Sequence, residues 1–206
     1  MIDAKRLFDE IRAIKGSPLT QAEVDTVNAI LAPVQASPLS PPIPWLARAK
    51  QELGVHETPG AVTTPRIELY RSMAGLSGIK GDDGAVPWCA IFVGAMLRQV
   101  GLQASGSAMA RSYSNWGERC PDGTPGAITV KSSTRGPTSG HAFFATGNVT
   151  TTHIEGLGGN QSDAVTLAWW PRAEIVTSRW PSGVPMPAAG ANMVSAIQPP
   201  KKVTDV

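Results

Sequence analysis

Two kinds of hydrophobic spacing divide the chain into a helical first half and a strand-rich second half. Helical spacing of apolar residues, with helix-breaking residues between, predicts helices within residues 3–32, 45–54, 65–75, 89–101 and 107–116. Short β-branched or aromatic runs, separated by Gly, Asn, Ser and Pro, predict strands at residues 126–130, 141–147, 153–157, 164–169 and 173–178. Strands that follow helices in this order predict an α+β fold, with helices packed on a mainly antiparallel sheet.

The beginning of the chain predicts a short helical hairpin. A first apolar pattern at helical spacing ends at the breaker segment of residues 16–18, which contains Gly16 and Pro18. Thr20 then opens a second helix in a capping-box pattern with Glu23, and Pro33 ends that helix.

The densest run of prolines marks a domain boundary. Each Pro in residues 37–44 disfavours helix at itself and at the residue before it, so we expect an extended linker there. The sequence then divides into a helical segment (1–36), the linker (37–44), a main domain (45–181) and a Pro-, Ala- and Gly-rich tail (182–206) that we expect to be poorly ordered.

Composition and charge exclude several classes of function. The 206 residues are 42% hydrophobic, which is enough for a sizeable core. The 18 Lys and Arg residues against 16 Asp and Glu give a net charge of +2, and no basic block indicates nucleic-acid binding. The longest apolar run, 89–97, is too short to span a bilayer, and the first 16 residues lack the apolar core of a secretory signal. We therefore expect a soluble monomer made in the cytoplasm, with no stable membrane insertion.

Cys89 is the first candidate for chemistry. It is expected at the first turn of a helix, directly after a glycine-rich loop, where backbone N–H groups and the helix dipole favour a thiolate. A cysteine beside Trp88 and ahead of an apolar helix can equally be a core residue.

His141 opens a predicted strand after a flexible segment and is a candidate base for such a thiol. A third polar group is needed to orient the imidazole, and Asn160, Glu155 or His153 could supply it. A histidine by itself is more often a surface or core residue. The order of a Cys on a helix, then a His and a polar residue on successive strands, is more informative than any one of them.

Eight blocks, in this order, resemble a subgroup of the NlpC-type and CHAP-type cysteine peptidoglycan hydrolases, which are often phage endolysins or prophage products. The blocks lie within residues 46–181 and read ELGVHETPG, PRIELY, VPWCAIFVGAMLRQVGL, ARSYSNWG, GAITV, GHAFFATG, LGGNQ and RWP. Residues 7–31 also resemble helical segments attached to phage lysozymes and endolysins.

The resemblance implies a papain-like fold and a Cys–His mechanism that needs no cofactor. It assigns Cys89 as the nucleophile, His141 as the base and Asn160 as the third residue, with Glu155 as the alternative. The implied partner is bacterial peptidoglycan, cut at an amide bond either between muramic acid and L-alanine or within the stem peptide. Such an endolysin would stay in the host cytoplasm until it is released to the periplasm or cell wall for host lysis.

Four further residues are candidates for binding the substrate. Arg111, Ser112 and Tyr113 precede the SNWG block, and an Arg pairs well with substrate carboxylates. Trp88 could offer a stacking face to a sugar. The alternative is that these residues belong to the core or to a packed helix.

Three rival functions compete with the thiol hydrolase. A zinc amidase could use His56, His141, His153 and Cys120, although these residues lack a tight metal-binding spacing. A non-catalytic wall-binding or phage structural module could use the same fold. A secreted interbacterial amidase toxin would have a similar sequence and would act with an immunity partner.

Overall fold

A computed structural model shows the fold of the chain. The structure describes residues 4–27, 42–60, 62–136, 138–187 and 193–194. These residues belong to two compact units, Met1–Pro41 and Pro42–Val206. Most of the proposed linker, residues 37–41, lies outside the described residues, whereas its last residue, Pro44, begins a helix.

The first unit contains the helix α1 (Ala4–Lys15) and a second helical stretch over residues 21–27. The capping box predicted at the start of the second stretch is present. The Thr20 N–H donates to Glu23 Oε2 at 2.8 Å, and the Glu23 N–H donates to Thr20 Oγ1 at 3.4 Å. Lys15 also pairs with Glu23, so Lys15 and Thr20 together lower the pKa of the Glu23 carboxyl to about 2.

The helices of the second unit precede most of its strands. They are α3 (Pro44–Gln51), α4 (Pro65–Met73), α5 (Cys89–Gln99) and two 3-10 turns, η1 (Ala110–Asn115) and η2 (Arg172–Glu174). Both α3 and α4 begin with a proline, whose fixed φ suits the first helical turn. The helix expected over 107–116 is the shorter 3-10 turn η1.

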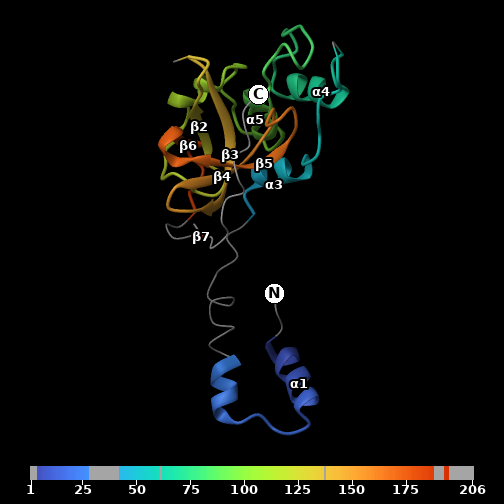
Figure 1. Ribbon diagram of the computed structural model, residues 1–206, viewed down its shortest axis with the longest axis vertical. Coiled ribbons are helices and arrows are strands. Elements are labelled where there is room, and N and C mark those ends of the chain that lie inside the picture. Colours follow the sequence, from blue (N-terminus) through green and yellow to red (C-terminus); the bar gives the residue numbers. More distant parts are fainter. Residues whose placement is uncertain (1–3, 28–41, 61, 137, 188–192, 195–206) are drawn as a thin grey trace. The chain divides into compact units, whose positions relative to one another are not determined.

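The second unit is built around one mainly antiparallel sheet with the strand order β1-β6-β2-β3-β4-β5 (Figure 1). Its strands are β1 (Glu118–Arg119), β2 (Ile128–Ser132), β3 (Gly140–Val149), β4 (His153–Gly158), β5 (Thr166–Pro171) and β6 (Ile175–Trp180). A short strand, β7 (Met193–Val194), pairs parallel with β3 and lies in the stretch expected to be a tail. The sheet together with the preceding helices confirms the α+β class.

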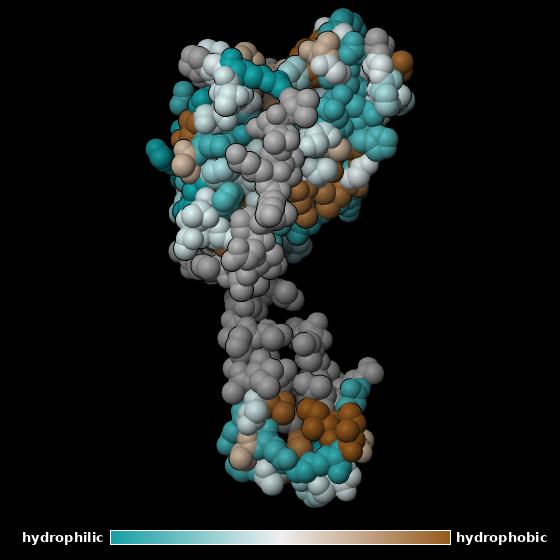
Figure 2. All heavy atoms as spheres, viewed as in Figure 1, coloured by the Kyte–Doolittle hydropathy of each residue, from teal (hydrophilic) through white to brown (hydrophobic). Residues whose placement is uncertain are grey.

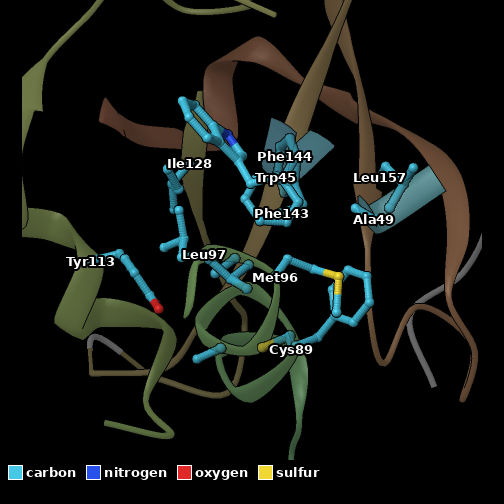
Figure 3. Close-up of a cluster of buried hydrophobic side chains, with 14 of the residues drawn as sticks. Trp45, Ala49, Cys89, Met96, Leu97, Tyr113, Ile128, Phe143, Phe144 and Leu157 are labelled. Carbon is cyan, nitrogen blue, oxygen red and sulfur yellow. The ribbon is translucent and has the colours of Figure 1, made fainter. Parts of the chain in front are cut away.

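The core lies between α5 and the sheet. Residues 89–97 of α5 are all buried, as expected for a helix that is apolar on every side. α5 packs on β3, α3 packs on both α5 and β4, and α4 packs on the other side of α5 (Figure 1). Figure 3 shows Met96 and Leu97 of α5 lying close to the aromatic residues of β3, Phe143 and Phe144. Nine buried residues in a row therefore hold the first turn of α5, which carries Cys89, against the sheet.

The surface of the second unit shows only scattered apolar residues. Figure 2 shows hydrophilic residues interspersed with small hydrophobic groups on the face that it presents. Among the described residues of this unit, the large apolar side chains that stay exposed are Leu53, Val62, Leu69, Met109, Leu167, Val176 and Met186. Among the described residues, the helices are all too short or too polar to cross a bilayer.

Candidate active site

Trp88 fixes the start of the helix that carries Cys89. Its side chain is fully buried, its indole stacks on Tyr70, and its Nε1–H donates to Glu57 Oε1 at 2.6 Å. A Cβ at Gly159 would lie 2.4 Å from the Trp88 ring and 2.7 Å from Phe92. Glycine is therefore required at 159 for the loop after β4 to approach the N-terminus of α5.

Burial dominates the electrostatics of Cys89. The residue is 5% exposed, and burial raises the pKa of its thiol. Hydrogen bonds from the backbone of Ala142 and Ala90 and the positive charge of Arg135 act in the opposite direction but do not reverse the shift. Burial therefore works against the thiolate that the helix N-terminus favours, and a base that accepts the thiol proton would offset the raised pKa.

His141 is placed by the pairing of β2 with β3. It lies directly opposite Lys131 in the antiparallel register, one residue before Ala142, whose backbone contacts the Cys89 sulfur. The imidazole packs against Phe143 and Trp170, with ring centroids 6.0 and 5.3 Å away. These aromatic contacts restrict the ring to one orientation.

Gln161, next to the expected Asn160, orients the imidazole. Gln161 Oε1 lies 3.0 Å from His141 Nε2, and Gln161 is 4% exposed. Its amide nitrogen donates to the carbonyl of Thr166 at 2.7 Å and to Thr166 Oγ1 at 3.2 Å. The turn after β4 therefore holds the amide with its oxygen toward the histidine.

This network determines which nitrogen of His141 carries the proton. Because Gln161 Nε2 is used on Thr166, its Oε1 must act as an acceptor. The indole Nε1–H of Trp170, which can only donate, points to the same oxygen at 3.3 Å. His141 Nε2 therefore donates to Gln161, and Nδ1 is the basic nitrogen of the neutral ring.

Trp170 reaches this network from β5 across the glycines of β4. A Cβ at Gly156 would lie 2.1 Å from the Phe143 ring, and one at Gly158 would lie 2.8 Å from Gln161 Oε1. Lys131 Nζ lies 4.1 Å from the centroid of the Trp170 ring and 3.2 Å from Glu174 Oε2. Trp170 and Lys131 are only 6% and 3% exposed, so they shield the His141–Gln161 hydrogen bond from water.

Cys89, His141 and Gln161 line one pocket of about 400 Å³. Its walls come from the loop before α4, the loop before α5, the end of β2 and the loop that follows it, the start of β3, the turn after β4, and β5. The remaining lining residues are Glu57, Asp83, Gly84, Pro87, Lys131, Ser133, Thr134, Arg135, Gly140, Asn160, Ser162, Asp163 and Trp170. A thiol, an imidazole and an orienting amide in one pocket can perform nucleophilic acyl transfer.

One wall of the pocket is acidic. Burial raises the pKa of the Glu57 carboxyl, and the nearby carboxylates of Asp163 and Asp83 raise it further, although the Trp88 hydrogen bond opposes them. Asp83 is 1% exposed, accepts the Thr64 N–H at 2.6 Å and pairs with the buried Arg71 at 3.3 Å. The fixed carboxylate of Asp83 thus ties the loop before α5 to α4.

Asn160 and Glu155, the two residues expected to complete the site, have other roles. Asn160 lines the pocket and adopts a left-handed φ of 56°, a conformation that Asn tolerates better than most residues. Glu155 Oε2 accepts hydrogen bonds from Thr146 Oγ1 at 2.7 Å and Asn148 Nδ2 at 2.8 Å, two residues of the distant end of β3. His141 Nε2 donates its hydrogen bond to Gln161, a residue that sequence reasoning missed by one position.

The four expected substrate-binding residues do not line this pocket. Trp88 and Tyr113 are fully buried, and Tyr113 lies in the core, with its hydroxyl directed toward α5 (Figure 3). Arg111 Nε donates to the Ser139 carbonyl at 3.0 Å, and Ser112 Oγ donates to the Met109 carbonyl at 2.7 Å. These contacts support the alternative of packing and loop anchoring for all four.

The side chains that would serve a zinc amidase are not brought together. His56 Nδ1 contacts the Glu57 carbonyl at 3.0 Å, and His153 Nδ1 contacts Thr152 Oγ1 at 2.9 Å. Within the described part of the chain, no three His, Cys, Asp or Glu residues are grouped as a metal site. Cys120 is buried, and burial raises the pKa of its thiol to about 11.

Comparisons of the chain with family models, with curated proteins and with solved structures found no match.

Proposed function

We propose that this protein is a cysteine peptidoglycan hydrolase of papain-like fold that cleaves an amide bond of the bacterial cell wall. The observation that carries the proposal is the hydrogen bond between His141 Nε2 and Gln161 Oε1 in the pocket that Cys89 also lines. It leaves Nδ1 as the basic nitrogen of a histidine that lines the same pocket as the Cys89 thiol. Two further hydrogen bonds to Thr166 anchor the Gln161 amide and keep its oxygen directed at His141 Nε2.

The reaction begins with transfer of the Cys89 thiol proton to His141 Nδ1, as the sulfur attacks the carbonyl carbon of the substrate amide. The carbonyl oxygen becomes an oxyanion, which the Cys89 backbone N–H at the start of α5 stabilises. The imidazolium then gives its proton to the leaving amine, and a thioester remains on Cys89.

Water completes the cycle. His141 Nδ1 accepts a proton from a water molecule, whose oxygen attacks the thioester carbonyl. The acid product leaves, and the proton returns to the Cys89 sulfur. Throughout the cycle, Gln161 Oε1 accepts the Nε2–H and stabilises the imidazolium when it forms.

The proposed substrate follows from the resemblance of the eight blocks to peptidoglycan hydrolases and is consistent with the charges of the pocket. Glu57, Asp83 and Asp163 line one part of it, while Arg135 lines another; Lys131 also lines the pocket, but Glu174 balances its charge. A peptidoglycan stem peptide carries both carboxylates and amino groups, so walls of opposite charge suit it. The bond is either the one between muramic acid and L-alanine or one within the stem peptide, in an endolysin acting in host lysis.

Digestion of purified peptidoglycan by the wild type and by Cys89→Ala tests the proposal, with the products identified by mass spectrometry. Release of intact stem peptides would establish an amidase, and cleaved stems would establish an endopeptidase. We expect the activity to survive EDTA and to be lost after treatment with iodoacetamide. Undigested peptidoglycan with the wild type, or equal digestion by Cys89→Ala, would refute the proposal.

A further inference from the structure

The ammonium group of Lys131 is buried between two partners beside the candidate active site. The Lys131 side chain is 4% exposed, although an unpaired lysine is rarely buried. Its Nζ lies 3.2 Å from Glu174 Oε2 and 4.1 Å from the centroid of the Trp170 ring. The ring face attracts the cation, and the carboxylate balances its charge.

Trp170 links this ammonium to the histidine. Its indole N–H shares the oxygen atom of Gln161 with the His141 Nε2–H, and its ring lies against the imidazole. A rotation of the indole would move both the hydrogen-bond donor and the packing surface of His141. The tilt of the indole therefore affects where the basic nitrogen of His141 lies.

Backbone pairing fixes the relative positions of these groups. Lys131 lies opposite His141 on β2, and the Ser132 hydroxyl donates to the backbone carbonyl of Glu174 at 3.2 Å. Glu174 belongs to η2, and its side chain is 43% exposed. It is therefore the solvent-facing end of the contacts that run through Lys131 and Trp170 to the pocket. The glycines of β4 leave room for the Phe143 ring and for the Gln161 amide, which a Cβ at Gly156 or Gly158 would crowd.

We propose that Lys131 is a positioning residue: held by Glu174 against the face of Trp170, it keeps the indole in the orientation that lets Gln161 hold His141 for proton transfer from Cys89. This inference rests on the proposed function, because it assigns Lys131 a part in the reactivity of the Cys89–His141 pair. It concerns the reactivity of the thiol and not the binding of peptidoglycan.

The test measures the rate at which iodoacetamide alkylates Cys89, in a Cys120→Ser background so that only one thiol is followed. This rate requires no peptidoglycan, so it distinguishes failure of the inference from failure of the proposed function. We expect Lys131→Met to lower the rate at pH 7 about tenfold, since small misplacements of catalytic groups cost up to roughly a hundredfold. Lys131→Arg keeps the cation over the ring and should retain most of the wild-type rate.

A double variant shows whether Lys131 acts through the indole. Trp170→Phe keeps an aromatic ring but removes the N–H donor to Gln161, and we expect a similar fall in rate. Both changes act on the orientation of Gln161 and His141. The fold-losses in alkylation rate caused by Lys131→Met and Trp170→Phe should therefore not multiply in the double variant. In two-dimensional NMR spectra, the Trp170 indole N–H resonance should shift in Lys131→Met and stay near its wild-type position in Lys131→Arg.

The pH profile of alkylation gives a second readout of the Cys89–His141 pair, besides the rate at pH 7. The titratable or charged groups that line the pocket around His141 are Cys89, Arg135, Glu57, Asp83 and Asp163, besides Lys131 itself. All except Lys131 are kept in every variant, and Lys131→Arg retains the positive charge. The profile of Lys131→Met should therefore rise at higher pH than that of wild type, whereas the profile of Lys131→Arg should coincide with wild type.

Three results would overturn the inference. The first is a folded Lys131→Met protein with the wild-type alkylation rate and pH profile. The second is an equal loss of alkylation rate in Lys131→Met and in Lys131→Arg. A raised KM for peptidoglycan with unchanged alkylation would show instead that Lys131 binds substrate. If Lys131→Met fails to fold, Glu174→Gln removes the exposed outer partner, and we expect about a threefold fall in rate; an unchanged rate there contradicts the inference.

Discussion

Replacing Gln161 by Met tests how the imidazole is held. The change keeps the length of the side chain but removes the oxygen that accepts from His141 Nε2 at 3.0 Å and from Trp170 Nε1 at 3.3 Å. A neutral hydrogen bond contributes about 1 kcal/mol net, and a buried donor left without a partner costs roughly 1–3 kcal/mol. If about 1–2 kcal/mol of this loss falls on the orientation of His141, kcat decreases about 5- to 30-fold, since about 1.4 kcal/mol is a factor of ten in rate.

The assay follows the release of soluble products from purified peptidoglycan, at a temperature where each variant is fully folded by circular dichroism. The matched control is Asn160→Ala, which changes the adjacent residue in the same turn. Asn160 has a left-handed φ and is not the partner of His141, so its replacement should cost stability but less than threefold in kcat. A larger loss of kcat in Asn160→Ala than in Gln161→Met would show that the orienting residue is assigned wrongly.

Three further predictions follow from the surroundings of the site. Asp83→Ala removes the buried carboxylate that pairs with Arg71 and accepts the Thr64 N–H, while Arg71 keeps Glu68 and the Gly81 carbonyl; it should lower the free energy of unfolding by about 3 kcal/mol, measured by urea denaturation. A change below about 1 kcal/mol would show that the buried Asp83 carboxylate contributes little to stability. Gly159→Ala places a methyl group 2.4 Å from the Trp88 ring and should cost about 1–3 kcal/mol in the same assay. The control Gly78→Ala, where no atom lies within 4 Å of the added Cβ and φ is not in the left-handed region, should leave the free energy of unfolding nearly unchanged. Burial raises the pKa of the Cys89 thiol above its ordinary value of 9.0, so in His141→Ala alkylation of Cys89 should become fast only above about pH 9, while the wild type reacts at lower pH; coincident profiles would show that His141 is not the base.

The local sequence was sufficient to predict the main elements. Cys89 begins a buried helix because the residues that follow are apolar on all sides, and Thr20 with Glu23 forms the capping box that their spacing predicts. The strands β2 to β6 start within two residues of the β-rich runs. The two-residue strands β1 and β7 were not predictable, because their partners, β6 and β3, are distant in the sequence and are brought near only by the sheet.

Only the part of the candidate site that depends on local sequence could be predicted. Cys89 and His141 could be named from their places at element starts, and the pocket includes both. In the turn after β4, Asn160 is a residue type that tolerates a left-handed backbone. This preference indicates that Asn160 serves the turn, and it would have favoured the next residue, Gln161, as the one whose side chain contacts His141. The roles of Trp170 and Lys131 depend on the register of β2 with β3 and of β4 with β5, which no local pattern encodes.

Detection of the acyl-enzyme tests the central claim most directly. Cys120→Ser protein is mixed with soluble peptidoglycan fragments, quenched in acid within seconds and analysed by intact-mass and peptide mass spectrometry. The account predicts an added acyl fragment on the peptide that contains Cys89, sensitive to hydroxylamine as a thioester is, and absent from Cys89→Ala. Cleavage of the fragments by Cys89→Ala at the rate of its parent protein, with no adduct on either protein, would contradict it.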